Sequence, residues 1–359
     1  MPTGPDDGAR LAYEAVEVVT DAELALLRQV AARLRTGMDA PGWAMDKLAQ
    51  LQMLRASMAR DLASLDADLA RVVNGAVQRA YTLGQSTAVA DLDDLGLAVR
   101  LPDAQWNAIT RIATDLQRTV TGLAPVILRS VTDAYQQAVG AELGSVLTGA
   151  QTRRQTAQAV LDRLLGQGIG GFRDAAGRNW RLESYVEMAV RTGAGLSAVA
   201  GHTDTLIASG QDLVQVIPGP RACPICDGWG GKVLSLTGAG VETIGPDGRV
   251  PVAGTLDQAR AAGFQHPNCR CNIGVYLPGT SSAVVHRPDP AGYEAQQDQR
   301  RFERRIRHAK RREALALDDV AAAKAGRQVR AAQADLRAHL AAHPELKRQP
   351  GREQIGRAL

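Results

Sequence analysis

The sequence predicts a mainly α-helical protein: an elongated helical N-terminal body, then a small α+β module rich in Cys and His, then a basic helical C-terminal tail. Three observations lead to this fold class. Only 4% of the 359 residues are aromatic, Ala, Leu, Val and Arg fill the segments between glycines, and all four Cys fall in one Pro- and Gly-rich stretch. Ala, Leu and Arg lose little freedom in a helix, whereas sheets recruit aromatic and β-branched residues.

Changes in composition divide the chain into five predicted segments. These are a flexible N-terminus (1–11), a helical body (12–210), the Cys/His module (211–280), a linker (281–298) and the basic tail (299–359). The sequence has no apolar run of about 18 residues and does not start like a signal peptide. We therefore expect no membrane association, and a protein that stays in a cytoplasm or is assembled into a particle.

The first half of the body is predicted from a capping signal and from apolar periodicity. Thr20-Asp-Ala-Glu23 matches a capping box, so a helix is expected from there to Gly37. From Met45 to about Leu83, apolar residues recur three and four positions apart, which places them on one stripe of a long helix. The stripe consists of Leu48, Leu51, Leu54, Met58, Leu62, Leu65, Leu69, Val72 and Ala76.

The second half of the body continues with helices and one hairpin. Residues 102–149 predict a long helical region broken near Gly122 and Pro125, and Thr152-Arg-Arg-Gln155 is a second capping box. A hairpin is expected at 172–180, and a further helix should run from Ser184 to about Ala208. The glycines at 166, 168 and 171 match a dinucleotide-binding motif, but the strand, turn and helix that this motif requires are missing, so we interpret them as a loop.

The predicted module combines short strands with one short helix. Strands are expected at 213–217, 232–236 and 272–277, and a helix at 256–262. Trp229, which stands among glycines, is expected to cover the core of the module.

Two short motifs in the module carry metal-ligand residues. Cys223-Pro-Ile-Cys226 is a C-x2-C pair, and His266-Pro-Asn-Cys269-Arg-Cys271 follows 39 residues later. Zinc in structural sites takes four Cys or His ligands in a tetrahedron, often from two such knuckles. The motifs therefore predict a structural zinc held by four of these five residues. Reduced buried thiols and a disulfide formed after release from a cell are the alternatives.

The basic tail is a candidate contact for nucleic acid. Residues 300–359 contain 16 Lys and Arg against 7 Asp and Glu, an excess of +9, while the rest of the chain carries −5. Such a segment could bind DNA phosphates or an acidic protein surface. The candidate DNA contacts are Arg304, Arg305, Arg307, Lys310 and Arg311. Phe302 is the one aromatic residue there that could stack on a base.

Other polar residues have structural interpretations. Arg191 lies on a predicted helix, where it could pair with Glu187 or Asp204. We interpret the remaining histidines as surface or linker residues: His202, His286, His308, His339 and His343.

Several of these motifs together resemble one protein family. Arg191-Thr192, residues 210–214, Cys223–Cys226 with residues 231–233, and His266–Arg270 are similar to the phage minor capsid protein 2 family, which is related to the Mu F-type head morphogenesis proteins. The tail, from Gln299 to Gln354, also resembles that family. In many relatives a His stands where this chain has Cys271, so Cys271 is either a substitute ligand or an incidental thiol.

The resemblance implies a helical structural component of a phage head rather than an enzyme. It implies a low-copy virion protein near the portal or the inner capsid, made in the host cytoplasm, with the portal or the major capsid protein as partner and with no established chemistry. Oligomerisation within the virion and contact between the tail and packaged DNA are further expectations. The alternative is a metal-dependent hydrolase, either a nuclease or a capsid maturation protease, which would use the Cys/His cluster with Asp227 or Glu242 as the acid.

Overall fold

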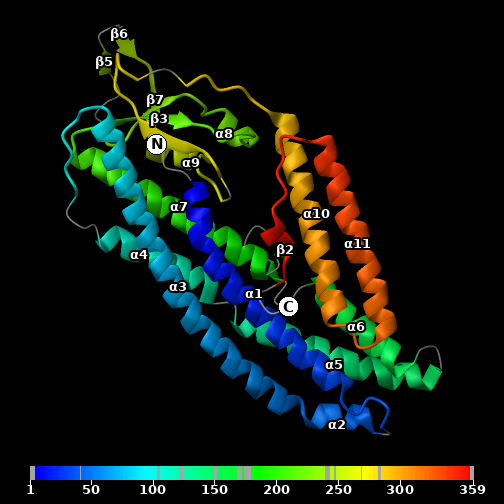
Figure 1. The fold of residues 1–359 in the computed structure, drawn as a ribbon. Helices are drawn as coiled ribbons and strands as arrows, with labels where there is room; N and C mark the ends of the chain where they lie inside the picture. The colour runs from blue at the N-terminus through cyan, green and yellow to red at the C-terminus, as the bar shows by residue number, and fades with distance from the viewer. Residues whose placement is uncertain are drawn as a thin grey trace. The chain divides into compact units, whose positions relative to one another are not determined.

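In the computed structural model, the described residues are 5–40, 42–102, 106–121, 124–148, 152–167, 172–173, 179–180, 182–238, 243–245, 248–267, 269–281 and 284–355. The chain forms two compact units. Unit 1 contains Met1–Ala15, Ala70–Thr119 and Glu187–Glu294, and unit 2 contains Val16–Leu69, Val120–Val186 and Ala295–Leu359. The predicted fold class, mainly α with a small α+β module, is confirmed (Figure 1).

Helix α1 (Pro5–Arg35) begins earlier than the sequence analysis predicted. Thr20 lies inside it and donates its hydroxyl to the Val16 carbonyl at 2.7 Å, so the predicted capping box at Thr20 is wrong. The flexible N-terminus predicted for residues 1–11 is also corrected, since the chain is helical from Pro5. A proline followed by acidic residues fits the first turn of a helix as well as it fits a loop.

The long apolar stripe is confirmed, although it spans two helices. Helix α2 (Trp43–Ala49) ends before Gln50, and α3 (Leu51–Asp94) carries the rest. Every stripe residue from Leu51 to Ala76 is buried, whereas Leu48 on α2 is 38% exposed.

The next helices follow the predicted breaks. Helices α4 (Trp106–Thr121) and α5 (Ala124–Thr148) separate where expected, and α6 (Arg153–Gln167) follows them. Thr152 and Gln155 form a reciprocal capping box, with hydrogen bonds of 3.0 and 3.3 Å. The predicted hairpin is present as β1 (Phe172–Arg173) and β2 (Asn179–Trp180). Residues 168 and 171 of the glycine motif lie outside the described residues.

Helix α7 (Leu182–Ala208) packs against α3 in unit 1 through glycines. A Cβ atom on Gly84 would lie 1.9 Å from the Ala198 carbonyl oxygen, and one on Gly201 would lie 2.1 Å from the Tyr81 carbonyl oxygen. The two helix backbones therefore meet in direct contact. No side chain larger than hydrogen fits at either glycine without moving a helix.

Buried polar groups also join α3 and α7. His202 is fully buried, and its Nε2 lies 3.2 Å from a carboxylate oxygen of Asp91. This corrects the interpretation of His202 as a surface residue. The Tyr81 hydroxyl donates to Asp204 at 2.8 Å, and Arg191 pairs with Glu187, one of its two expected partners.

We expect Gly84→Ala to destabilise unit 1 by about 1–3 kcal/mol, the usual cost of an overpacked core position. Alanine ordinarily stabilises a helix relative to glycine, so the sign of the change reports the close contact. Gly75 on the same helix is the control, because its added Cβ would meet only the mobile guanidinium of Arg79, at 3.1 Å. Urea unfolding should show Gly75→Ala to be neutral or stabilising. Equal effects of the two substitutions would contradict the contact.

The α+β module of unit 1 is built on a four-stranded sheet with the order β7-β4-β3-β8. Its strands are β3 (Leu213–Ile217), β4 (Val233–Ser235), β7 (Val252–Thr255) and β8 (Asn272–Val275). Strand β3 pairs antiparallel with β4 and β8, and β4 pairs parallel with β7. A separate hairpin joins β5 (Thr243–Gly245) and β6 (Gly248–Val250). The three predicted strands correspond to β3, β4 and β8.

Two short helices complete the module: α8 (Pro224–Asp227) and α9 (Leu256–Ala261), the second of which was predicted. The core of the module includes Leu92 from α3 and Leu206 from α7, so the sheet packs on the two helices through a shared core. Trp229 packs against this core as expected, with its ring 6.4 Å from that of Phe264.

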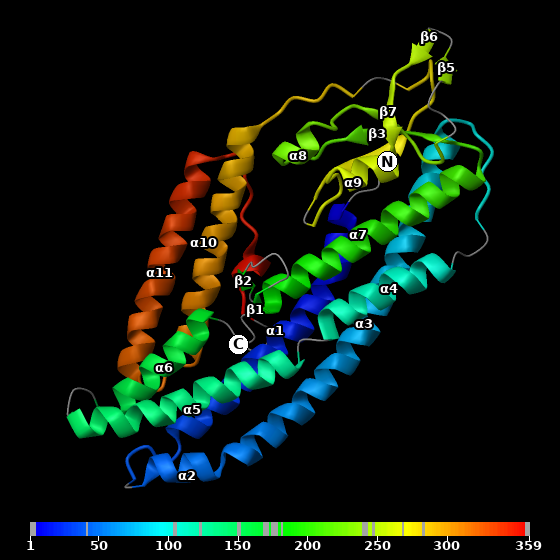
Figure 2. The same cartoon turned by 180° about the vertical axis from the view of Figure 1, so that it is seen from behind.

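The basic tail in unit 2 forms a helical hairpin. Helices α10 (Pro290–Ala314) and α11 (Asp319–Ala342) lie side by side in both views, and a 3-10 turn (Pro350–Glu353) follows (Figures 1 and 2). Because α10 starts at Pro290, the predicted linker (281–298) ends earlier than expected. Among the described residues, no helix is long and apolar enough to cross a membrane.

Candidate metal centre

The five predicted ligand residues lie on two loops of unit 1. Cys223 is the N-cap of α8, where its sulfur accepts the Cys226 backbone N–H at 3.4 Å. The other three residues lie between α9 and β8, where the Cys269 N–H donates to the His266 carbonyl at 2.9 Å and closes a turn. The Cys271 N–H donates to the Cys269 sulfur at 3.4 Å. Each loop therefore folds back on its own first cysteine, as a metal-binding knuckle does.

The two loops meet in two groups of donor atoms that share Cys226. Cys223 Sγ lies 2.8 Å from His266 Nε2, and Cys226 Sγ lies 3.3 Å from Cys269 Sγ. The ligand atoms of Cys223, Cys226 and His266 lie within 4.8 Å of one another, and so do those of Cys226, Cys269 and Cys271. Thiolates about 2.3 Å from a tetrahedral zinc stand about 3.8 Å apart, so Cys226 and Cys269 would move apart by about 0.5 Å to admit the ion. All four cysteines are free.

His266 is oriented for coordination by its own loop. Its Nδ1 lies 2.8 Å from the Pro267 carbonyl oxygen, to which a protonated Nδ1 donates. When the ring is neutral, the other nitrogen, Nε2, carries the lone pair and faces Cys223, and when the ring is protonated Nε2 donates to the Cys223 thiolate. Metal-binding histidines are commonly fixed by a hydrogen bond of this kind from the second ring nitrogen.

Hydrogen bonds within the cluster favour thiolates at the first cysteine of each knuckle. Bonds from the Cys226 and Cys271 thiols lower the pKa of Cys269 to about 3. Burial opposes ionisation of Cys223, but the Cys226 backbone N–H and His266 lower its pKa overall. Bonds to Cys269 and Cys271, together with burial, raise the pKa of Cys226. Zinc binds the deprotonated thiol, so two sulfurs are already suited to it.

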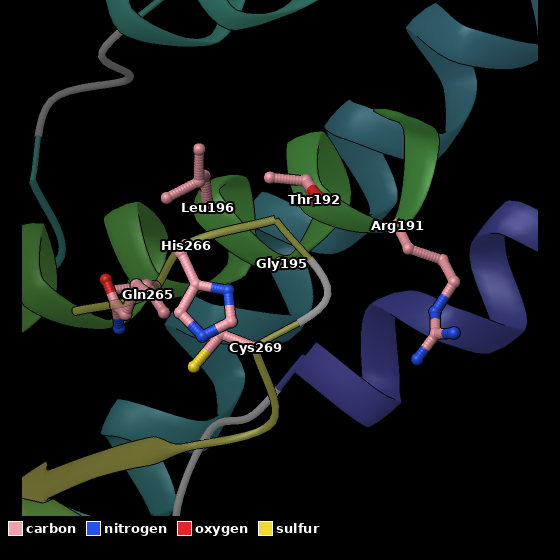
Figure 3. Close-up of a pocket in the computed structure, with 8 residues that line it drawn as sticks. Arg191, Thr192, Gly195, Leu196, Gln265, His266 and Cys269 are labelled. Carbon is pink, nitrogen blue, oxygen red and sulfur yellow. The ribbon is translucent and has the colours of Figure 1, made fainter. Parts of the chain in front are cut away.

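A small pocket of about 20 Å³ separates this loop from α7. His266 and Cys269 face α7 near Gly195 and Thr192, while the Arg191 side chain points away from them (Figure 3). The Arg191 guanidinium lies 3.5 Å from Glu187 and is 7% exposed. Arg191 therefore stabilises its own helix. The pocket has space for about one water molecule.

Asp227, one of the two acids of the hydrolase hypothesis, has a partner that sequence reasoning missed. Its carboxylate lies 2.6 Å from His286 Nε2, and both side chains are less than one-fifth exposed. A Cβ atom on Gly230 would come within 2.5 Å of the His286 ring, so the chain around His286 packs closely on the Gly230 loop. Only the adjacent glycines could have indicated this contact. Glu242 lies outside the described residues.

The tail residues predicted to contact DNA do not share one environment. Arg311 is buried, and its guanidinium lies 3.2 Å from the buried Glu23 carboxylate. Arg307 donates to the Arg352 carbonyl, and Lys310 donates to Gln354 at 3.2 Å. The other two predicted residues, Arg304 and Arg305, are exposed.

Comparison with known proteins identifies the family. The model of the family described as Phage minor capsid protein 2 matches residues 5–341, which cover most of both units and include all five candidate ligands. No curated protein and no solved structure matches. The expected resemblance is thus confirmed over nearly the whole chain, and with it the assignment to the structural proteins of a phage particle. The chain belongs to the phage minor capsid protein 2 family.

Proposed function

We propose that this virion protein is a low-copy component of the phage head, near the portal or on the inner capsid, and that one structural zinc holds its Cys/His module together. The observation that carries the zinc proposal is the convergence of the two knuckles, with His266 Nε2 2.8 Å from Cys223 Sγ. This role needs no reaction. The module would present a rigid surface to the portal or the major capsid protein after synthesis in the host cytoplasm, and several copies could assemble there.

The ligands we propose are Cys223, Cys226, His266 and Cys269. The first three lie within 4.8 Å of one another, and His266 is oriented through Pro267. Cys269 lies 3.3 Å from Cys226 and lines the same pocket as His266. Cys271 also lies within 4.8 Å of Cys226 and Cys269, but because His266 completes the set of four we propose that Cys271 is a core thiol beside the site. When bound, zinc would cross-link the α8 loop to the loop before β8.

Two alanine variants test this ligand set. We expect Cys269→Ala protein to be purified with much less zinc, because three ligands remain, whereas Cys271→Ala should keep one zinc per chain. Both substitutions remove a buried thiol, so the loss of packing is matched. Metal content is measured by mass spectrometry on the full chain. Zinc lost only in Cys271→Ala would replace Cys269 by Cys271 as the fourth ligand, and zinc absent from the unmodified protein would overturn the proposal.

The basic tail is the part we propose to contact packaged DNA. Its charge excess and the exposure of Arg304 and Arg305 support this contact. Arg311 is buried and paired with Glu23, so we leave it out of the proposed contacts.

A further inference from the structure

A groove runs between the two helices of the tail hairpin. It has a volume of about 500 Å³ and is lined on α10 by Arg301, Arg304, Arg305, His308 and Arg312. On α11 the groove is lined by Gln328, Ala331 and Ala332, none of which is charged. Arginines are therefore concentrated on one side of a groove whose other side is small and uncharged. This arrangement exposes their guanidinium groups to a ligand that enters the groove.

The acidic neighbours of these arginines hold them weakly. Arg301 pairs with Asp298 at 3.2 Å and Arg305 pairs with Asp335 at 3.0 Å. Both arginines are more than half exposed, and ion pairs in water contribute little. A phosphate could therefore displace either carboxylate. Arg312 differs, because it is mostly buried against Asp162 and helps to form the base of the groove.

The spacing of the exposed arginines fits a nucleic-acid strand. From Arg301 to Arg305 the helix advances about 6 Å at 1.5 Å per residue, which matches roughly three consecutive phosphates of a duplex strand at about 3.4 Å per step. Arginine binds phosphate oxygens through a planar fork of N–H donors, so it suits such a row of phosphates.

Base stacking is not available in this groove. Phe302 packs against the apolar core between α10 and α11, which contains Ile306, Ala332 and Leu336. Its ring lies 5.3 Å from that of His339, and Arg301 and Arg305 lie over it at 5.7 and 5.8 Å. Phe302 therefore supports the two arginines from below and does not serve as a platform for a base. Contacts would be limited to the backbone and would not read sequence.

We propose that this groove binds the phosphate backbone of duplex DNA through Arg301, Arg304 and Arg305, independently of sequence. This proposal rests on the proposed contact between the tail and packaged DNA. It moves that contact from the whole basic stretch to the groove. Arg307, Lys310 and Arg311, which the sequence grouped with Arg304 and Arg305, bond instead to the C-terminal segment or to α1.

The test compares two triple variants of the full chain. Arg301, Arg304 and Arg305 are changed to Gln in one, and Arg327, Arg330 and Arg337 in the other. The second set lies on α11, is exposed and does not line the groove. Both variants lose three positive charges. Binding to a random-sequence 20-base-pair duplex is measured by fluorescence anisotropy between 50 and 300 mM NaCl (roughly the range over which phosphate contacts are screened).

We expect the groove variant to bind at least about tenfold more weakly, with a log–log salt slope shallower by about 3, since each phosphate contact contributes about one unit. The control should change little. Equal losses in both variants, or no duplex binding by the unmodified chain, would overturn the proposal. Binding of poly-glutamate without binding of the duplex would assign the groove to an acidic protein. Zinc content is measured on the same samples, so that a failure of the DNA proposal can be distinguished from a failure of the metal proposal.

Discussion

Chelation of the metal should unfold the Cys/His module. Structural zinc contributes on the order of 10 kcal/mol of apparent free energy in small domains, more than most domains have in reserve. Cys226, Cys269 and Cys271 belong to the core that the sheet shares with α3 and α7. Without the metal, this core would have to keep thiols and a half-buried imidazole together through weak hydrogen bonds alone. We therefore expect a strong chelator to lower the first thermal transition by 10 °C or more (roughly 2 kcal/mol or more at the melting temperature).

Trp229 provides a local reporter of this transition. It packs against the module core beside Phe264, so unfolding of the module should shift its fluorescence to the red. The other tryptophans also fluoresce, so a Trp229→Phe variant serves as the control. This variant should show no red shift, but its melting temperature should fall on chelation as it does in the unmodified protein. Zinc added back in excess should restore both signals. A chelated protein that melts like the untreated one would show that packing alone holds the module.

Truncation of Arg311 should destabilise unit 2 by about 3–5 kcal/mol, because one charge of a buried pair is left without its partner. The side chains of Arg311 and Glu23 are 3% and 1% exposed, and they join α10 to α1. In the Arg311→Ala variant, the Glu23 carboxylate would stay buried and would face the cavity left by the arginine side chain. Urea unfolding at neutral pH measures the difference.

Two controls separate this effect from the loss of a surface charge. Arg305→Ala, on the same helix, removes a half-exposed pair with Asp335 and should cost less than about 1 kcal/mol. The double variant Glu23→Leu, Arg311→Leu should recover most of the stability, since apolar replacement of a buried pair is often neutral. If Arg311→Ala behaves like Arg305→Ala, the pair is not buried in solution, and Arg311 returns to the set of candidate DNA contacts.

Local patterns predicted those elements whose signals are contained within a few residues. The apolar stripe from Leu51 to Ala76 required only helical periodicity, and the capping box at Thr152 involved a partner three residues away. The strands β3, β4 and β8 followed from short β-prone runs between glycines and prolines. The same capping pattern failed at Thr20 because α1 begins at Pro5, so Thr20 lies inside a helix and not at its start.

What the sequence could not predict depends on contacts between distant segments. The metal ligands were found because the C-x2-C and H-x2-C-x-C motifs are local, but their convergence depends on how α8 and the loop before β8 meet. No local signal marks His202 or His286 as buried, because their partners, Asp91 and Asp227, are 111 and 59 residues away. The tail arginines form one basic stretch in the sequence, but Arg311 is buried against Glu23 of α1, whereas others line the groove.

X-ray absorption at the zinc edge of the purified protein tests the proposed metal centre by identifying the atoms bound to the metal. We predict one zinc per chain with three sulfur neighbours at about 2.3 Å and one nitrogen neighbour at about 2.0 Å, as expected for Cys223, Cys226, Cys269 and His266. A shell of four sulfurs would exclude His266 and assign Cys271 as a ligand. An oxygen neighbour from water would indicate an open site of the catalytic type. Protein without bound metal would contradict the proposed zinc centre.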